Sequence, residues 1–256
     1  MTDVLVCIKR VADATGEVVL TEDAQAVDGR HAGFTVSAHE ECAVELAVRA
    51  AHATTGTATV VTVGSDDAVD QLRAALSVGC TAATHVHADP TTYGPRDVAA
   101  ELAEVVRAHT AAGRPHDLVL LGNDAADSGD FQVGIRLAHE LGWPVVNGAV
   151  TVEVEDDDVV ARVHASSGHE TYRVPLPAVV TVLEGGVEPR YPSVPGRMRA
   201  RKVEVEDRKP VTDFGGASRV RLRLPPPQPS EVQVLGDGPG AAPALVDLLE
   251  QLGVLR

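Results

Sequence analysis

The chain has 256 residues, of which 44% are hydrophobic and only 3% aromatic, and its formal net charge is −15. This length allows one large domain, or one domain with a tail, around a sizeable core. The acidic balance and the scarcity of aromatic rings argue against binding to nucleic acid or to anionic membranes. No apolar run approaches the roughly 20 residues that span a bilayer, so direct membrane insertion is not expected.

The cysteines and the first residues of the chain indicate the cellular compartment of the protein. Cys7, Cys42 and Cys80 are scattered, without a CxxC pair. This spacing disfavours a disulfide framework or a cysteine-rich metal site and fits a reducing environment. The chain enters a strand pattern at once, without the charged leader and apolar core of a signal peptide. We therefore expect a cytoplasmic protein.

Buried strands alternate with amphipathic helices through the first half of the chain. Short apolar runs predict strands at 4–8, 58–63, 84–87 and 118–121, the third nearer an edge because it is more polar. Ser37 followed by Glu40 predicts a capping box at the start of the first helix. The alternation predicts an α/β fold, with a mostly parallel sheet and helices on both faces.

The pattern changes after Pro144. Residues 145–155, 159–164 and 170–174 alternate between apolar and polar, which predicts an antiparallel β excursion, and 178–183 reads as a buried strand that returns to the sheet. We expect an ordered but exposed loop over 184–209, which is rich in Pro, Gly and Arg. A helix over 242–252 follows a proline-rich stretch at 225–227, and it is expected to dock on this chain or on another one.

Two parts of the chain follow from this organisation. Residues 1–210 are expected to form the α/β domain, which includes an exposed loop at about 184–205. Residues 211–256 are expected to form an extended C-terminal arm that ends in the short helix.

The stretch from Asp117 to Val133 is the first candidate for a binding site. A buried strand ends at Gly122 and a small polar loop follows. An amphipathic helical pattern then runs through Ile135, Leu137, Ala138 and Leu141, with Asp127, Ser128 or Asp130 as expected caps. Ligands of parallel α/β sheets bind at the carboxyl ends of the strands, and helix starts offer free N–H groups to anions. The loop is therefore a candidate for the phosphate end of a nucleotide. The alternative is an ordinary connection, because most such loops bind nothing and acidic side chains oppose a bare phosphate site.

Two other groups of residues have competing interpretations. His85 and His87 point the same way on a strand, but no carboxylate or cysteine at suitable spacing completes a metal site, so surface histidines are expected. A basic cluster in the 184–209 segment either pairs with the protein's own acidic surface or steers an acidic partner. Its members are Arg190, Arg197, Arg199, Arg201, Lys202, Arg208 and Lys209. No motif nominates a nucleophile with a general base.

Two segments resemble a known family. Residues 120–127 with Gln132, and residues 176–181 followed by Glu188-Pro189-Arg190-Tyr191-Pro192-Ser193, are similar to the β subunit of electron-transfer flavoprotein. Weaker matches lie at 6–11, 43–49, 73–79 and 198–202, and all segments occur in the family's order between residue 4 and about residue 205.

The resemblance implies an α/β fold of the adenine-nucleotide-binding type and an electron-transfer subunit without substrate chemistry of its own. The implied partners are the α subunit, which holds most of a FAD that the two subunits share, and flavin dehydrogenases such as acyl-CoA dehydrogenases. The β subunit itself is expected to bind a structural AMP, or a second FAD in the bifurcating branch of the family. The arm is expected to pack on the partner subunit.

The resemblance also implies site residues. The nucleotide is expected to contact Cys7, Ser37, Ala38, His39, Glu40, Val63, Gly122, Asn123, Asp124, Ala125, Ala126, Asp127, Ser128, Gly129, Asp130, Phe131, Gln132 and Val133, with amides of 128–132 on the phosphate. The surface that docks on the dehydrogenase is expected to include Arg190, Tyr191, Pro192, Ser193, Val194, Pro195, Arg197 and Met198, with Val194 as the apolar anchor.

The sequence departs from the family's usual pattern at several of these positions. Ser37-Ala38-His39 replaces an Asn-Pro-aromatic stretch, and Val133 replaces a common Thr. Lys9 to Asp13 disfavours the bifurcating branch, whereas Gln132-Val133-Gly134 favours it, so AMP and FAD both stay open. A stand-alone nucleotide-binding or nucleotide-cleaving domain of the same fold is the alternative of a different class, although it would need neither the arm nor the basic loop.

Overall fold

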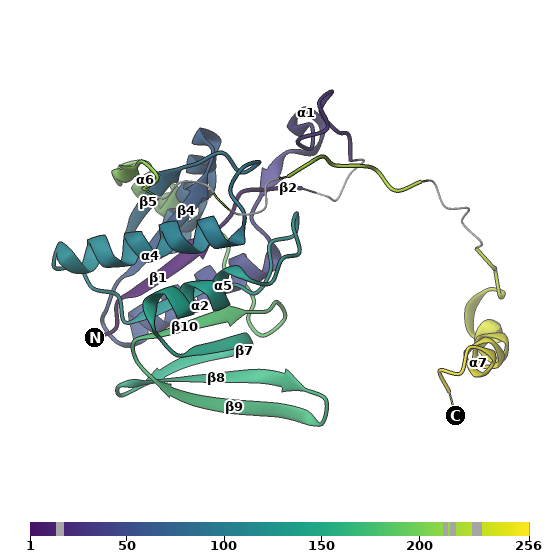
Figure 1. Ribbon diagram of the computed structural model, residues 1–256. Helices are drawn as coiled ribbons and strands as arrows, with labels where there is room; N and C mark the ends of the chain where they lie inside the picture. The colour runs from purple at the N-terminus through teal and green to yellow at the C-terminus, as the bar shows by residue number, and fades with distance from the viewer. Residues whose placement is uncertain (14–17, 212–214, 216–218, 227–231, 256) are drawn as a thin grey trace. The chain divides into compact units, whose positions relative to one another are not determined.

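The computed structural model describes residues 1–13, 18–211, 215, 219–226 and 232–255 (Figure 1). The chain divides into two compact units, Met1–Leu222 and Arg223–Arg256. The first unit contains the sheet and the helices that cover it, which confirms the predicted α/β class. Among the described residues, no helix has the length and apolar character that crossing a membrane would require.

The first unit is built on one nine-stranded sheet with the order β11-β5-β4-β1-β6-β10-β7-β8-β9. Neighbouring strands from β11 to β7 are parallel, and β8 and β9 add antiparallel pairs, as the alternating pattern predicted. The strands are β1 Val4–Ile8, β4 Ala58–Gly64, β5 Ala82–His87, β6 Leu118–Gly122, β7 Val145–Glu155, β8 Asp158–Ala165, β9 Gly168–Pro175, β10 Ala178–Val182 and β11 Val205–Arg208.

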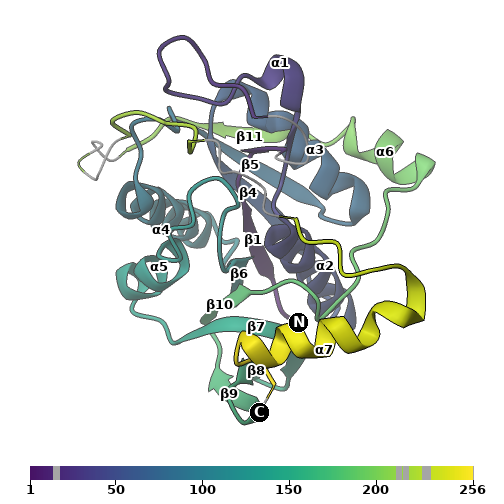
Figure 2. The same ribbon diagram turned by 90° about the vertical axis from the view of Figure 1, so that its right-hand side faces the viewer.

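Helices cover both faces of the parallel part of the sheet, as predicted (Figure 2). Helices α2 (Ala38–Ala53) and α3 (Val69–Val78) lie on one face, and α4 (Pro95–Ala111) and α5 (Val133–Leu141) lie on the other. Val4 and Val6 of β1 pack in the cluster that contains α2, whereas Leu5 and Cys7 pack in the cluster that contains α4. Strand residues alternate between faces, so a wholly apolar strand buries both sides.

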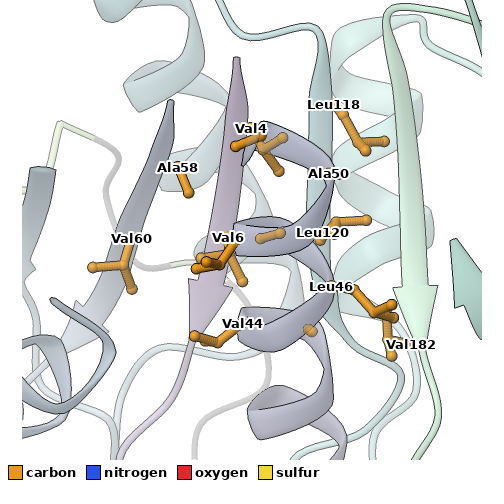
Figure 3. Close-up of a cluster of buried hydrophobic side chains, with 14 of the residues drawn as sticks. Val4, Val6, Val44, Leu46, Ala50, Ala58, Val60, Leu118, Leu120 and Val182 are labelled. Atoms are coloured by element: carbon orange, nitrogen blue, oxygen red, sulfur yellow. The ribbon is translucent and has the colours of Figure 1, made fainter. Parts of the chain in front are cut away.

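The core under α2 shows how these short runs hold the sheet together (Figure 3). Val4, Val6, Leu118 and Leu120 have no exposed surface, and Leu46 of α2 packs in the same cluster. Burying each such side chain contributes about 1.5–3 kcal/mol relative to leaving it exposed. This buried centre fixes where the strand ends lie, and therefore where the loops after them meet.

Two expectations for the ends and connections of elements are wrong. The segment 184–209 is not a continuous loop: it contains α6 (Val194–Ala200), which Ser193 caps, and β11, which pairs with β5. Helix α5 begins at Val133 with Gln132 at its N-cap position, so Asp127, Ser128 and Asp130 do not cap it. The composition of 184–209 resembles that of a loop, but α6 packs on α3 and β11 pairs with β5.

Other local predictions agree with the structure. Ser37 and Glu40 form the predicted capping box of α2. A single antiparallel bridge joins Leu20 to Val27. The remaining short elements of the first unit are β2 (Val11–Ala12), α1 (Gly29–Ala32), β3 (Phe34–Thr35) and the 3₁₀ helix η1 (Asp66–Ala68).

The second unit consists of the 3₁₀ helix η2 (Gly238–Ala241) and helix α7 (Ala242–Gln251), close to the predicted last helix. None of the residues of α7 is buried, and Leu245 and Val246 of α7 and the C-cap residue Leu252 are exposed large apolar side chains. Of the proline-rich stretch at 225–227, Pro227 lies outside the described residues.

Candidate nucleotide site at the carboxyl edge of the sheet

A cavity of about 400 Å³ lies at the carboxyl ends of β1, β4, β5 and β6. Its walls include residues at or just after the ends of these four strands: Cys7 to Lys9, Val63, Ala88, Pro90, Thr91, Tyr93, Gly94, Gly122 to Ala125, Asp127, Ser128 and Asp130 to Val133. The four strands are neighbours in the sheet and parallel, so their ends meet at one edge. The cavity therefore occupies the place where the sequence predicted a ligand.

The structure brings most of the expected nucleotide residues together at this cavity. Those that line it are Cys7, Glu40, Val63, Gly122, Asn123, Asp124, Ala125, Asp127, Ser128, Asp130, Phe131, Gln132 and Val133. Ser37, Ala38, His39, Ala126 and Gly129 do not line it. Ser37 lies behind the wall, where its Oγ donates to the Asp124 carbonyl oxygen at 3.3 Å, and Ala38 lines a separate cavity beside Cys42.

The loop before α5 has two kinds of amide. The N–H groups of Ser128 and Gly129 donate to the Ala125 carbonyl oxygen, at 3.1 and 3.0 Å, so the turn itself uses them. The N–H groups of Asp130, Phe131 and Gln132 donate to no other described residue. With the first N–H groups of α5, these amides leave a short row of donors beside the cavity, which is suited to an anion.

The left-handed backbone of this loop depends on Gly129. Gly129 has φ = +62°, and a Cβ there would meet nothing within 4 Å. Phe131 also has a positive φ of 54°, which is uncommon for a bulky residue. The positive φ, rather than a steric clash with neighbouring atoms, therefore favours glycine at position 129.

Glu40 forms part of the cavity wall from the first turn of α2. Its carboxylate accepts hydrogen bonds from the Ser37 amide at 3.0 Å and the Ser37 hydroxyl at 2.9 Å. Burial raises the pKa of Glu40 to about 7, although these hydrogen bonds and Lys9 act in the opposite direction. Burial, with a contribution from Glu40, also raises the pKa of the Cys7 thiol, which therefore stays neutral.

Gly122 allows this helix to approach the end of β6. A Cβ at Gly122 would lie 2.7 Å from Glu40 Cγ, a separation that real side chains do not reach. The glycine that ends the buried run therefore gives the carboxyl group of Glu40 access to the cavity.

Charged groups in the cavity wall are mostly acidic. Lys9 Nζ lies 2.6 Å from Asp127 Oδ1, so this cation is paired with the loop. Oδ1 of Asp124 is buried and has no hydrogen-bond partner among the described residues. Burying an acceptor without a hydrogen bond costs free energy, and a ligand that donates a hydrogen bond to this oxygen removes that cost.

Sequence reasoning missed two parts of the wall. The turn after β5 contributes Pro90, Thr91 and Tyr93, and the position of β5 beside β4 was the signal that could have found it. Arg219 and Leu222 contribute from far along the chain, and no local pattern marks them. The Arg219 amide donates to the Thr91 carbonyl oxygen at 3.1 Å, and the Leu222 amide donates to that of Ala24 at 2.7 Å.

The residues expected to dock on a dehydrogenase lie on and before α6. Tyr191, Val194 and Met198 expose 91%, 73% and 60% of their surface, which leaves an apolar patch on this short helix. Pro192 is partly exposed, Pro195 and Arg197 are exposed, and Ser193 Oγ accepts a hydrogen bond from the Gly196 amide at 3.1 Å. Arg190 instead pairs with Glu45 of α2, with Nε and Nη2 at 2.7 and 2.9 Å from the carboxylate oxygens.

The basic cluster divides between its two interpretations. Arg190 and Arg208 form ion pairs within the protein, and Arg199 donates to the Leu76 carbonyl oxygen at 3.2 Å. The other members make no ion pair with a described residue; these are Arg197, Arg201, Lys202 and Lys209. Positive side chains without an ion pair therefore lie on α6 and just after it, at Arg197, Arg201 and Lys202.

Comparison with known proteins identifies the family. The family model described as electron transfer flavoprotein domain matches residues 27–212. Proteins named electron transfer flavoprotein subunit beta are similar over most of the chain. The Bacillus subtilis protein is 32% identical over 205 residues, which cover 80% of this chain and 78% of that protein. The Syntrophomonas wolfei protein is 33% identical over 240 residues, with 90% and 89% covered. The chain therefore belongs to the electron transfer flavoprotein β-subunit family.

Proposed function

We propose that this chain is the β half of a heterodimeric electron transfer flavoprotein, which takes electrons from a flavin dehydrogenase and passes them to a downstream acceptor. The observation that carries the proposal is the cavity at the carboxyl edge of the sheet in a member of this family. The FAD that accepts and donates the electrons is held mainly by the α subunit, and this chain helps to enclose it. The chain performs no substrate chemistry of its own.

The occupant that we propose for the cavity is AMP, with a structural role. A cavity of about 400 Å³ lies in the lower part of the range for small-molecule sites. FAD is larger than AMP by a second phosphate, a ribityl chain and a three-ring flavin. The free amides of 130–132 and the start of α5 suit the phosphate. Asp124 Oδ1 suits a ribose hydroxyl or an adenine amino group.

The C-terminal arm has a place in the same proposal. Helix α7 has no buried residue and exposes several large apolar side chains. Such a helix gains stability by packing its apolar side against another surface. We assign that surface to the α subunit.

The proposal is tested by co-expression with a candidate α subunit and by counting the nucleotides released on denaturation. One FAD and one AMP in each yellow 1:1 complex is the expected result. Two FAD and no AMP would show the bifurcating type of subunit and would contradict the AMP assignment. A colourless monomer that hydrolyses ATP would show a stand-alone nucleotide-cleaving domain and would overturn the proposal.

Gly129→Val tests the position of the phosphate. Valine at φ = +62° forces the loop to change its backbone, so we expect the released AMP to fall and its Kd to rise at least about 10-fold. Gly113→Val is the matched control, because Gly113 also has open space and a positive φ of 75° but follows α4, outside the loop that precedes α5. Equal nucleotide content in both variants would contradict the proposed position.

A further inference from the structure

His85 and His87 belong to a cluster that the electron-transfer role does not use. The sequence offers the two histidines on one face of a strand but no third ligand nearby. Strand pairing supplies it, because Asp207 of β11 is the register partner of His85 of β5. Register partners on neighbouring strands lie on the same face of a sheet, so all three side chains share that face.

The three side chains are close enough to share one ion. One ligand atom from each of His85, His87 and Asp207 lies within 4.8 Å of the others, and the two imidazole rings have centroids 4.1 Å apart. His87 Nε2 lies 3.0 Å from Asp207 Oδ1. His85 is buried, whereas 37% of the His87 side chain and 71% of the Asp207 side chain are exposed, so the cluster opens to solvent on one side.

A fourth residue, Asp66, contacts His87 on the ring nitrogen that does not face Asp207. Asp66 lies in η1, two residues after Gly64, and Gly64 is the register partner of His87. His87 Nδ1 lies 2.8 Å from Asp66 Oδ1. Metal-ligating histidines almost always donate their second N–H to a carboxylate, a carbonyl or water, which fixes the tautomer and orients the ring. Asp66 would hold the proton on Nδ1 and leave Nε2 as the ligand atom.

We propose that His85, His87 and Asp207 bind a divalent transition-metal ion of the zinc type, with Asp66 orienting His87. Two imidazole nitrogens and one carboxylate oxygen suit Zn²⁺ or Co²⁺ rather than Mg²⁺ or Ca²⁺, which take oxygen ligands. Three protein ligands leave a fourth position for water. The bound ion joins β11 and η1 to the end of β5, so it stabilises the edge of the sheet beside α6.

Metal titration of the full chain tests the proposal. The affinity tag is removed, the protein is treated with chelator and exchanged into chelator-free buffer, and Co²⁺ is added while the visible absorption is recorded. We expect one saturable Co²⁺ per chain, displaced by Zn²⁺. His87→Gln and Asp207→Asn should each weaken binding by at least about 10-fold, and Asp66→Asn should weaken it about 10- to 100-fold. Unchanged urea unfolding of the metal-free variants would show that they fold.

His164→Gln/His169→Gln is the matched control. These histidines pair across β8 and β9 with ring centroids 4.8 Å apart, but they belong to no three-ligand group within the described part of the chain. The control should bind Co²⁺ as the parent chain does. Lack of saturable binding up to about 100 µM metal would overturn the proposal. So would binding that survives His87→Gln and is lost in the control, because the exposed hairpin pair would then be the site.

Discussion

Glu40 and Glu45 lie on the same helix, α2, yet their carboxyl groups have opposite pKa shifts. Burial raises the pKa of Glu40 to about 7, because only hydrogen-bond donors and the paired Lys9 oppose it. Burial also acts to raise the pKa of Glu45, but hydrogen bonds and charge from Arg190, with Arg49, lower it to about 2. The neighbours of each carboxyl group, rather than its burial alone, decide its charge.

Glu40→Gln should change how stability depends on pH. The folded pKa of about 7 lies above the ordinary value of 4.5, so the folded state binds more protons between these two values. Stability of the parent chain therefore falls as pH rises from 4.5 to about 7 and then levels off. The variant lacks this loss. The free energy of unfolding of the variant minus that of the parent should therefore be about 2–4 kcal/mol larger at pH 8 than at pH 4.5.

Urea unfolding at several pH values measures this gain, with Glu153→Gln on an exposed position of β7 as the control for the lost charge. A difference between Glu40→Gln and the parent that does not vary with pH would show that the carboxyl group titrates at the same pH in the folded and unfolded states.

Arg190→Met should destabilise the protein at neutral pH. Glu45 is buried, with 3% of its side chain exposed, and loses two of its charge-assisted hydrogen bonds in the variant. We expect a loss of about 1–2 kcal/mol, since the half-exposed Arg190 is partly screened by water. The folded pKa of Glu45 is below its ordinary value, so this contribution is full above pH 4.5 and shrinks as pH falls toward 2.

Urea unfolding from pH 7 to pH 3.5 follows the contribution of Arg190. Arg173→Met is the control, because Arg173 pairs with Glu155 and Asp158 at a site where all three side chains are more than a third exposed. Removing such a surface pair should cost less than about 1 kcal/mol. Equal losses in the two variants would contradict the special role of the Arg190–Glu45 pair.

At the scale of elements, α6 is a helix packed on α3, where the sequence predicted an ordered but exposed loop. A Cβ at Gly196 would lie 2.2 Å from the Ser77 carbonyl oxygen, so the helix packs directly against the end of α3. Arg73 Nη1 donates to the Ala200 carbonyl oxygen at 2.6 Å, which holds the other end. The apolar patch of Tyr191, Val194 and Met198 is therefore presented from a fixed base.

Val194→Ala should slow electron transfer from a partner dehydrogenase while the FAD content of the heterodimer is unchanged. Val194 is 73% exposed, so the substitution removes contact area at the docking surface without creating a cavity. We expect kcat/KM for the dehydrogenase to fall about three- to tenfold. Val211→Ala is the control, because Val211 is 63% exposed and lies outside α6. Loss of FAD in Val194→Ala would contradict a docking role.

At the scale of the molecule, the division after Leu222 separates the unit that contains the sheet and the cavity from a C-terminal arm. The unit Met1–Leu222 contains all residues that line the cavity, including Arg219 and Leu222. The arm contains α7, none of whose residues is buried. The two units therefore have different tasks in the proposed heterodimer.

A chain that ends at Leu222 should keep its fold and nucleotide but lose the α subunit. We expect its urea midpoint and AMP content to match those of the full chain, because the sheet, its covering helices and all residues that line the cavity lie within Met1–Leu222. Co-purification with the α subunit should fall at least about 10-fold. A truncated chain that unfolds more easily and still co-purifies would show that the arm stabilises its own chain.

The sequence by itself determined the alternation of strands and helices, the capping box of α2 and the polar loop at Gly122. These features depend on burial and on hydrogen bonds between residues close in sequence. The spacing of apolar residues, every two in a strand and every 3.6 in a helix, therefore predicts them. Tertiary structure alone decided three others: the pairing of β11 with β5, the pKa of Glu40, and the closing of the cavity by Arg219 and Leu222. His87 and Asp207 meet across 120 residues of sequence. Strand order creates such contacts, and no local pattern encodes strand order.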